Sequence, residues 1–320
     1  MIRIGQIGVG HNHGAAKLNA FRRFPELFEI VGVAEADDAW WERRGNLYDW
    51  TVRMSEEELL EQVDAVVVET DVPDLIAAAR RCIRAGKHVH MDKPAGGDLE
   101  EYRLMLEEAK EKGLIVQLGY MLRYNPGIAR VVEAVRNGEL GVIDSIDAEM
   151  STGHDGWYRK WLDGIEGGVH YIMGSNMVDL IVRMLGEPNT VTHFGRCTGR
   201  DGIHYMDNNL TVLEYDTAIV RLVVSSCEIN GHGQRRLVVA GSKGTYKIEP
   251  LETNQVVAYS EPGANPYANI FTALEIPQQE DRYEEQVHDF HDYILGLKEN
   301  PYSYDFEYSV EKIIRKVAKI

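Results

Sequence analysis

The chain has 320 residues, of which 44% are hydrophobic and 27% charged, and these values are typical of a globular protein of two domains. Its 51 acidic residues outnumber its 34 basic residues, and the net charge of −17 would repel nucleic acids and anionic membranes. We therefore expect neither as a partner. The three cysteines are scattered without metal-ligand spacing, which favours a reducing compartment. The N-terminus enters a predicted strand without a leader-like segment, so we expect a cytoplasmic protein.

The first third of the chain alternates short apolar runs with helical patterns. The apolar runs lie at residues 2–9, 28–35, 64–70, 88–91 and 114–121. Several of them are apolar on both faces, which is typical of a parallel sheet covered by helices on both sides. Residues 74–87 and 98–113 have helical spacing between these runs. The pattern predicts a doubly wound α/β domain of the Rossmann type at residues 1–121.

After residue 121 the pattern changes to long β-rich segments. Helical patterns occur at about 168–185, at about 282–297 and from about 307 to the end. Strands that succeed one another without intervening helices form a mainly antiparallel sheet. We therefore predict that residues 122–320 form an α+β domain.

The segment GVGHNHG follows the first predicted strand and opens a helix. In a dinucleotide-binding turn, Gly8 makes the tight turn, and Gly10 lets backbone N–H groups approach a pyrophosphate at the positive end of the next helix. The third position of this fingerprint is His13 instead of glycine or alanine. We predict that the loop binds the cofactor through Gly8, Gly10, His11, Asn12 and His13.

Two residues at the ends of later strands extend the predicted cofactor site. Glu35 lies roughly 25 residues beyond Gly10, where a carboxylate accepts hydrogen bonds from the ribose hydroxyls of NAD and repels the 2′-phosphate of NADP. The segment EADD adds further acids and has no nearby arginine, so we predict NAD. The alternative for Glu35 is an ordinary acid at a strand end. Thr70 ends the strand at 64–70 and is predicted to line the same edge of the sheet.

The segment HVHMDKP ends the next strand with Asp92, Lys93 and Pro94. Proline restricts the residue before it, so Lys93 has less backbone freedom than a lysine in an ordinary loop. Ligands of open α/β sheets bind at the carboxyl ends of the strands, and we therefore expect Lys93 near the nicotinamide half of the cofactor. The alternative is a solvated turn. His88 and His90 share one face of the strand, and we interpret them as core or crevice residues, so no metal is predicted.

In this order, the motifs resemble the Gfo/Idh/MocA oxidoreductase family, named for glucose–fructose oxidoreductase and inositol dehydrogenase. The resemblance spans nearly the whole chain. It rests on the segments IGQIGVGHNHG, VDAVVVET, GKHVHMDKP, GYMLRYNP, GGVHYIMGSNMVDL and VVAGSKGTYKIEP. It implies a second domain that contacts substrate and an open-faced sheet used in homodimers or homotetramers. The substrates that it implies are sugars, polyols or related hydroxy compounds.

The resemblance and the chemistry together indicate Lys93 as a catalytic residue. Oxidation of an alcohol removes a hydride from carbon and a proton from oxygen, and a lysine beside the nicotinamide can position or accept that proton. Members similar to inositol dehydrogenase have an Asp and a His one helical turn apart, where this chain has Ile172 and Asn176. Neither is a general base. We expect Asn176 to position the substrate hydroxyl, or else to pack in an apolar stripe, and His170 is the reserve candidate for a proton relay.

Two segments are predicted to contact the substrate. RYNP places Arg123 and Tyr124 where the chain passes from one domain to the next, a common position for a ligand cleft. Trp157 and Tyr158 offer aromatic faces for a sugar ring, although the same residues could cover the domain junction. We expect an NAD-dependent dehydrogenase that acts on a CH–OH group of a sugar, polyol or sugar acid. The alternatives are a redox-assisted epimerase or eliminase that reduces NAD transiently, and an inactive NAD-bound sensor.

Overall fold

The computed structural model describes residues 1–253, 255–260 and 271–320. Within it the chain forms two compact units. The first contains residues 1–121 and 283–308, and the second contains residues 122–282 and 309–320. The sequence predicts the same boundary after residue 121 but places residues 283–308 in the second domain. They group with the first unit because Phe290 packs against Phe21, with ring centroids 6.0 Å apart, and against His90 at 5.8 Å.

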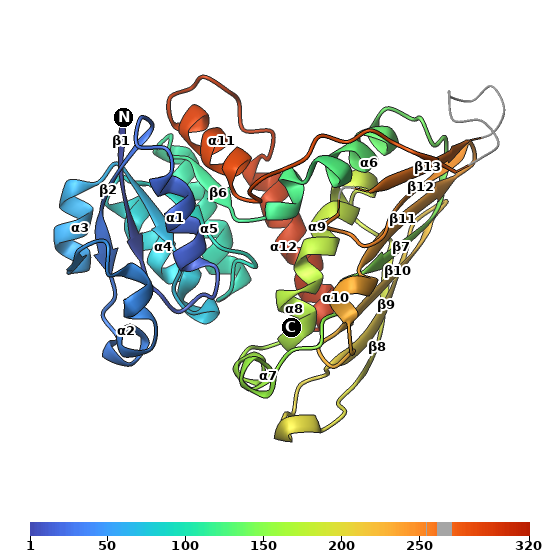
Figure 1. The fold of residues 1–320 in the computed structure, drawn as a ribbon, viewed down its shortest axis with the longest axis horizontal. Coiled ribbons are helices and arrows are strands. Elements are labelled where there is room, and N and C mark those ends of the chain that lie inside the picture. The colour runs from blue at the N-terminus through green and yellow to red at the C-terminus, as the bar shows by residue number, and fades with distance from the viewer. Residues whose placement is uncertain (254, 261–270) are drawn as a thin grey trace. The chain divides into compact units, whose positions relative to one another are not determined.

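The first unit is a parallel sheet with helices on both faces (Figure 1). Among the described residues, its strand order is β3-β2-β1-β4-β5-β6, and the pairs are parallel. Its strands are β1 (Ile2–Ile7), β2 (Phe28–Ala34), β3 (Arg53–Met54), β4 (Ala65–Val68), β5 (His88–Met91) and β6 (Val116–Leu118). Its helices are α1 (Gly14–Arg22), α2 (Asp38–Arg44), α3 (Glu56–Gln62), α4 (Leu75–Arg84), α5 (Leu99–Glu111) and α11 (Glu284–Ile294), with the 3-10 turns η1 (Gly45–Tyr48) and η2 (Val72–Asp74). The predicted doubly wound fold is confirmed.

The strand order of this sheet determines where a ligand can bind. The chain builds one half of the sheet with β1 to β3 and then returns to the centre, where β4 pairs in parallel with β1 and starts the other half. All four residues of β4 are buried, as expected for a strand covered on both faces. At such a switch point the loops after neighbouring strands separate and leave a crevice at their carboxyl ends. The loops after β1, β2, β4 and β5 therefore form the candidate site.

The second unit is a large sheet with helices α6, α8 and α9 on one face (Figure 1). In the described residues its strand order is β14-β13-β12-β11-β7-β10-β9-β8, in which β7 and β10 are parallel and the other neighbours are antiparallel. Its strands are β7 (Ile143–Glu149), β8 (Thr190–Arg196), β9 (Asn208–Glu214), β10 (Ile219–Ser225), β11 (Arg236–Gly241), β12 (Gly244–Ile248), β13 (Val256–Ser260) and β14 (Thr272–Ala273). The predicted α+β class with a mainly antiparallel sheet is confirmed.

The helices of this unit are short. They are α6 (Pro126–Arg136), α7 (Gly156–Asp163), α8 (Gly168–Ile172), α9 (Gly174–Leu185), α10 (Gly231–Gln234) and the 3-10 turn η4 (Arg200–Gly202). The turn η3 (Met121–Tyr124) and the last helix, α12 (Tyr304–Ala318), contain residues of both units. No helix in the described ranges combines the length and the apolar composition needed to cross a bilayer.

The single helix predicted from Gly168 to Leu185 is two helices in the structure. They meet at Met173, beside Gly174. The N–H of Asn176 donates to the carbonyl of Met173 at 3.3 Å, an i→i+3 bond that tightens the turn at this point. Glycine has a low helix propensity, so the break between the two helices falls beside the residue that favours a helix least.

Candidate active site

The glycine turn after β1 has no space for side chains. Gly8 has a φ of +85°, and a Cβ added there would lie 2.5 Å from the backbone of Thr70, which follows β4. A Cβ on Gly10 would lie 2.6 Å from the backbone nitrogen of Asp71. Helix α1 begins soon afterwards, at Gly14. A tight turn followed by a helix N-terminus is the arrangement that holds a pyrophosphate in dinucleotide-binding folds, and cofactor binding by this loop stays a prediction.

Glu35 lies against the same turn, just beyond the end of β2. Its carboxylate accepts hydrogen bonds from the N–H groups of Val9 at 2.9 Å and Asp37 at 2.8 Å. Arg53 also lies here, since its guanidinium donates to the carbonyl of Glu35 at 2.8 Å and to the carboxylate of Asp38 at 2.7 Å. The expectation that no arginine is near this acid was therefore wrong, because the parallel pairing of β3 with β2 brings residue 53 to the strand end.

Asp92, the residue after β5, joins the glycine loop to Lys93. Its Oδ2 atom lies 2.9 Å from His11 Nδ1, 3.0 Å from His13 Nδ1 and 2.9 Å from Lys17 Nζ. Its Oδ1 atom accepts the backbone N–H of Lys93 at 2.6 Å. Burial alone would raise the pKa of this carboxyl, but His11, Lys17 and His13 hold it well below its usual range. An ionised Asp92 thus fixes the backbone of Lys93, a buried residue, beside the predicted cofactor loop.

Glu69, the residue after β4, lies behind this cluster and is fully buried. Its Oε1 atom is 3.1 Å from Lys17 Nζ, and its Oε2 atom is 3.5 Å from His11 Nδ1. Burial raises the pKa of Glu69 well above its usual value, although Lys17 opposes the shift. Burial would lower the pKa of Lys17, but Asp92 and Glu69 raise it. Lys17 therefore stays an ammonium between two buried carboxyl groups.

The two histidines of the loop differ in exposure. The side chain of His11 is 1% exposed, whereas that of His13 is 21% exposed. Burial, opposed by Asp92, lowers the pKa of His13 to about 4, and His11 and Lys93 lower it further through their charges. Ligand atoms of His11, His13 and Asp92 lie within 4.8 Å of one another, a spacing that a metal ion could use. The ammonium of Lys17, however, already supplies a positive charge to the same Asp92 oxygen.

His90 lies in the interior of the first unit, whereas His88, at the start of β5, is half-buried. His90 Nδ1 is 2.8 Å from Gln117 Oε1, and its ring packs edge-on against Phe21 at 5.7 Å between centroids. Burial lowers the pKa of His90 to about 3. His88 Nδ1 accepts the backbone N–H of Ile115 at 3.0 Å. Both rings therefore serve the packing of β5 and β6.

In the second unit, His170 and Asn176 have different surroundings. His170 Nε2 is 2.8 Å from the hydroxyl of Thr211 on β9, and its ring stacks on His193 of β8. Burial, with the charge of His193, lowers the pKa of His170 to about 3, so the ring stays neutral at physiological pH. Asn176 is buried; its Nδ2 donates to the carbonyl of Met173 at 3.2 Å. Its Oδ1 has no hydrogen-bond partner among the described residues.

Arg123 is held inside the second unit. Its Nη2 donates to Asp179 Oδ1 of α9 at 2.6 Å, and its Nε lies 3.1 Å from both oxygens of that carboxylate. Both side chains are almost completely buried. This pair anchors η3 to α9. Tyr124 is half-buried, and its carbonyl accepts a hydrogen bond from Gln279.

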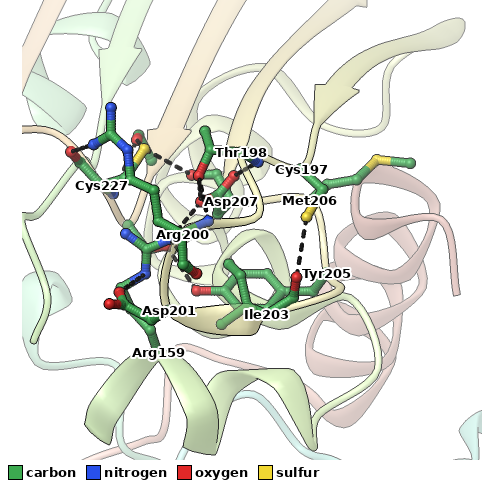
Figure 2. Close-up of polar contacts among 12 residues, drawn as sticks. Arg159, Cys197, Thr198, Arg200, Asp201, Ile203, Tyr205, Met206, Asp207 and Cys227 are labelled. Atoms are coloured by element: carbon green, nitrogen blue, oxygen red, sulfur yellow. Dashed lines mark hydrogen bonds and ion pairs between the residues drawn. The ribbon is translucent and has the colours of Figure 1, made fainter. Parts of the chain in front are cut away.

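Trp157 and Tyr158 lie on α7. Trp157 is 41% exposed, and Tyr158 stacks on His154 with ring centroids 4.1 Å apart. On the same helix, Arg159 donates to the buried carboxylate of Asp207 at 2.6 Å (Figure 2). Asp207 also accepts the backbone N–H and the hydroxyl of Thr198, at 2.8 and 2.5 Å. These contacts tie α7 to the loop between β8 and β9.

The sequence argument missed Lys17. The buried residues of α1 include Gly14, Lys17, Leu18 and Phe21, which follow helical spacing on one face. A lysine at a core-facing position of an otherwise apolar stripe is unusual, because lysines are almost never fully buried unless they are paired. The place of Lys17 in this apolar stripe was therefore the sequence signal that a buried acid contacts the lysine.

Two family models match the sequence. Residues 2–120 match the model described as "Oxidoreductase family, NAD-binding Rossmann fold", and residues 128–247 match the "GFO/IDH/MocA C-terminal domain". The chain belongs to the Gfo/Idh/MocA oxidoreductase family. The resemblance noted from the sequence is confirmed, and so is a Rossmann domain of the NAD-binding type in a member of an oxidoreductase family.

Two relatives from Bacillus subtilis (strain 168) are scyllo-inositol 2-dehydrogenases. The one named for NADP(+) is 26% identical over 132 residues, which cover 41% of this chain and 37% of the relative. The one named for NAD(+) is 27% identical over 208 residues, 63% of this chain and 60% of the relative. The matches thus span less than two thirds of either relative. Among solved structures, UDP-N-acetylglucosamine 3-dehydrogenase from Acidithiobacillus ferrooxidans has a TM-score of 0.81 at 21% identity, over 99% of this chain and 97% of that one, and so shares the fold.

Proposed function

We propose that this family member is an NAD-dependent dehydrogenase that acts on a CH–OH group of a polyol, sugar or sugar acid. The observation that carries the proposal is the position of Asp92, which contacts both histidines of the glycine loop and the backbone N–H of Lys93. A lysine is thereby fixed at the edge of the sheet where family members bind the dinucleotide. The inositol dehydrogenases among the relatives support a polyol as the first substrate class to test.

Lys93 is the residue proposed to handle the proton of the reacting hydroxyl. A bound nicotinamide supplies the hydride acceptor or donor for such a reaction. Lys93 donates a hydrogen bond to the substrate oxygen when it is charged and accepts the hydroxyl proton when it is neutral. Asn176 is proposed to position the substrate hydroxyl, because the carboxamide leaves a buried Oδ1 without a partner in the described part of the chain. His170, which packs on the sheet as a neutral ring, has no role in this proposal.

The preference for NAD rests on the charges around Glu35. The carboxylate held at the glycine turn favours ribose hydroxyls and repels a 2′-phosphate. Arg53 would favour that phosphate, but its guanidinium is paired with Asp38 and with the carbonyl of Glu35. Because this arginine is already paired, NAD is the proposed cofactor.

The exposed face of the second sheet is proposed to join copies of the chain into a homodimer or homotetramer. Phe194, Leu210 and Ile219 are 56%, 39% and 55% exposed. Strand pairing sets Phe194 opposite Leu210, and Ile219 lies on the next strand with its side chain on the same face. Exposed apolar groups gathered on one face are typical of a protein interface.

A spectrophotometric screen of NAD reduction across inositols, sugars and uronates tests the proposed activity. We expect net NADH formation with at least one of them and weaker or no reduction of NADP. Failure of the protein to bind NAD or NADP would contradict the proposal. Conversion of a substrate without net NADH would replace it with the redox-assisted epimerase or eliminase.

A further inference from the structure

Two buried carboxyl groups share one ammonium at the carboxyl edge of the first unit. Lys17 Nζ lies 2.9 Å from Asp92 Oδ2 and 3.1 Å from Glu69 Oε1, and the side chains of all three are at most 1% exposed. A buried carboxylate without a counter-charge is strongly disfavoured. One ammonium compensates one of these groups. The other either holds a proton or depends on a protonated histidine beside it.

A continuous series of contacts connects this buried pair to the crevice. His13, the partly exposed member, meets Asp92 Oδ2 through Nδ1 at 3.0 Å. The same oxygen is 2.9 Å from His11 Nδ1, which in turn lies 3.5 Å from Glu69 Oε2. Lys17 provides a second bridge between the two carboxyl groups. The contacts therefore run without interruption from His13 to Glu69.

We propose that Glu69 stores the proton that the reaction exchanges, and that Asp92 with His11, His13 and Lys17 passes this proton between Glu69 and the crevice. The proposal rests on the dehydrogenase function proposed above. It answers the question raised by Ile172 and Asn176, which cannot supply a proton. Asp92 and the two histidines act as relay residues. Glu69 does not contact the substrate itself but acts through these relay residues.

The transfers balance in both directions. In carbonyl reduction, Glu69 loses its proton, the relay delivers one proton to the substrate oxygen through His13 or Lys93, and a hydride from the reduced cofactor completes the C–H bond. In alcohol oxidation, the O–H and C–H bonds break, the hydride leaves with two electrons, and the proton returns to Glu69. An ionised Glu69 then coincides with the positively charged, oxidised nicotinamide, and a protonated Glu69 with the neutral, reduced form. Opposite charges are thus present together in the oxidised state and two neutral groups in the reduced state, so neither state holds an isolated charge.

The groups that face this cluster come from several elements of the first unit. They are His11, His13 and Lys17 of the loop and α1, Glu35 after β2, Arg44 of α2, Tyr48 of η1, His90 of β5, Asp92 and Lys93 after β5, and Tyr283 beside α11. Burial raises the pKa of the Tyr48 hydroxyl, so that this group stays protonated. Glu69 is the buried acid of the set whose pKa is raised, which is why the stored proton is assigned to it.

Infrared spectroscopy tests the stored proton without any cofactor. At neutral pH the protein should show the C=O band of a protonated carboxyl that shifts on labelling with ¹³C-glutamate and disappears in Glu69→Gln. The matched control is Glu307→Gln, which alters another buried glutamate of the first unit outside the cluster. The band should persist in that control. A spectrum without the labelled band, or a band that survives in Glu69→Gln, would overturn the assignment.

Kinetics then test the exchange. Glutamine keeps the shape of a neutral glutamate but cannot exchange a proton, so Glu69→Gln should lower kcat about tenfold or more in both directions while NAD affinity stays within about threefold. In the plot of kcat against pH, the limb that reports ionisation of the relay should also disappear. Wild-type kcat and an unchanged pH profile in Glu69→Gln would refute the relay.

An inactive wild-type protein that still shows the infrared band would instead refute the proposed dehydrogenase function. A tightly bound metal in purified protein that depends on His11, His13 and Asp92 would also overturn the relay.

Discussion

The Nδ1 atom of His13 lies 3.0 Å from the Oδ2 atom of Asp92. His13 departs from the dinucleotide fingerprint, which has glycine or alanine at this position. Although 79 positions separate His13 from Asp92 in sequence, they make one hydrogen bond. The imidazole at this departing position therefore meets Asp92 at the entrance to the buried cluster.

Replacement of Asp92 by asparagine should destabilise the first unit strongly. The change removes the charge that balances Lys17 in an environment from which water is excluded. Breaking a buried ion pair costs about 3 to 5 kcal/mol, and chemical denaturation of Asp92→Asn should show a loss of this size. Arg103→Gln, which breaks exposed pairs with Glu100 and Glu107, should cost less than about 1 kcal/mol. Similar losses in the free energy of unfolding of Asp92→Asn and Arg103→Gln would argue against a tightly coupled cluster.

The effect of pH on stability should reveal the raised pKa of Glu69. A group whose folded pKa is raised contributes stability that is fully present below its unfolded pKa, about 4.3, and that is lost as pH rises through the folded value. Glu69→Gln is neutral at every pH and escapes this loss. The Tm of the variant minus that of the wild type should therefore increase as pH rises above about 4.3. Parallel Tm curves would show that the pKa of Glu69 is not raised.

Cofactor choice should follow the charges around Glu35. Wild-type protein should bind NAD at least about tenfold more tightly than NADP, a difference of about 1.4 kcal/mol. Asp38→Asn should reduce the preference for NAD over NADP, because it releases Arg53 from its ion pair. Glu35→Gln should also reduce this preference, because it removes the carboxylate charge that repels the 2′-phosphate of NADP. Fluorescence titration with both cofactors measures each case. Equal affinities in the wild type would remove the role assigned to Glu35.

Substitutions of His170 and Asn176, the two candidate residues of the second unit, should have different effects on stability and catalysis. His170→Ala should lower Tm through loss of the Thr211 contact but leave the pH dependence of kcat/KM unchanged above about pH 5, because the pKa of His170 is about 3. Asn176→Ala should lower kcat/KM about tenfold without removing an ionisation. Ser175→Ala is the matched control, since that hydroxyl is bound to the carbonyl of Ile172. A pH limb lost in His170→Ala would restore the relay role expected from the sequence.

The sequence was sufficient for features that depend on local pattern. The apolar runs, the glycine turn and the position of Lys93 at a strand end all follow from residue spacing. Features that depend on pairing between distant segments could not be predicted in this way. Arg53 reaches Glu35 through the pairing of β3 with β2, and Lys17 reaches Glu69 through the packing of α1 on the sheet. The helical pattern of α11 showed that it is amphipathic but not which unit it would cover.

The most direct test of the account is the turnover of Lys93→Met with NAD and the best polyol or sugar substrate found for the wild type. We predict that kcat falls by about two orders of magnitude or more, the scale expected for loss of a positioned proton-transfer group. Circular dichroism and NAD titration should show a folded variant that still binds the cofactor, and Lys110→Met, at an exposed position on α5, should keep wild-type activity. A folded, NAD-binding Lys93→Met enzyme with wild-type kcat would contradict the account.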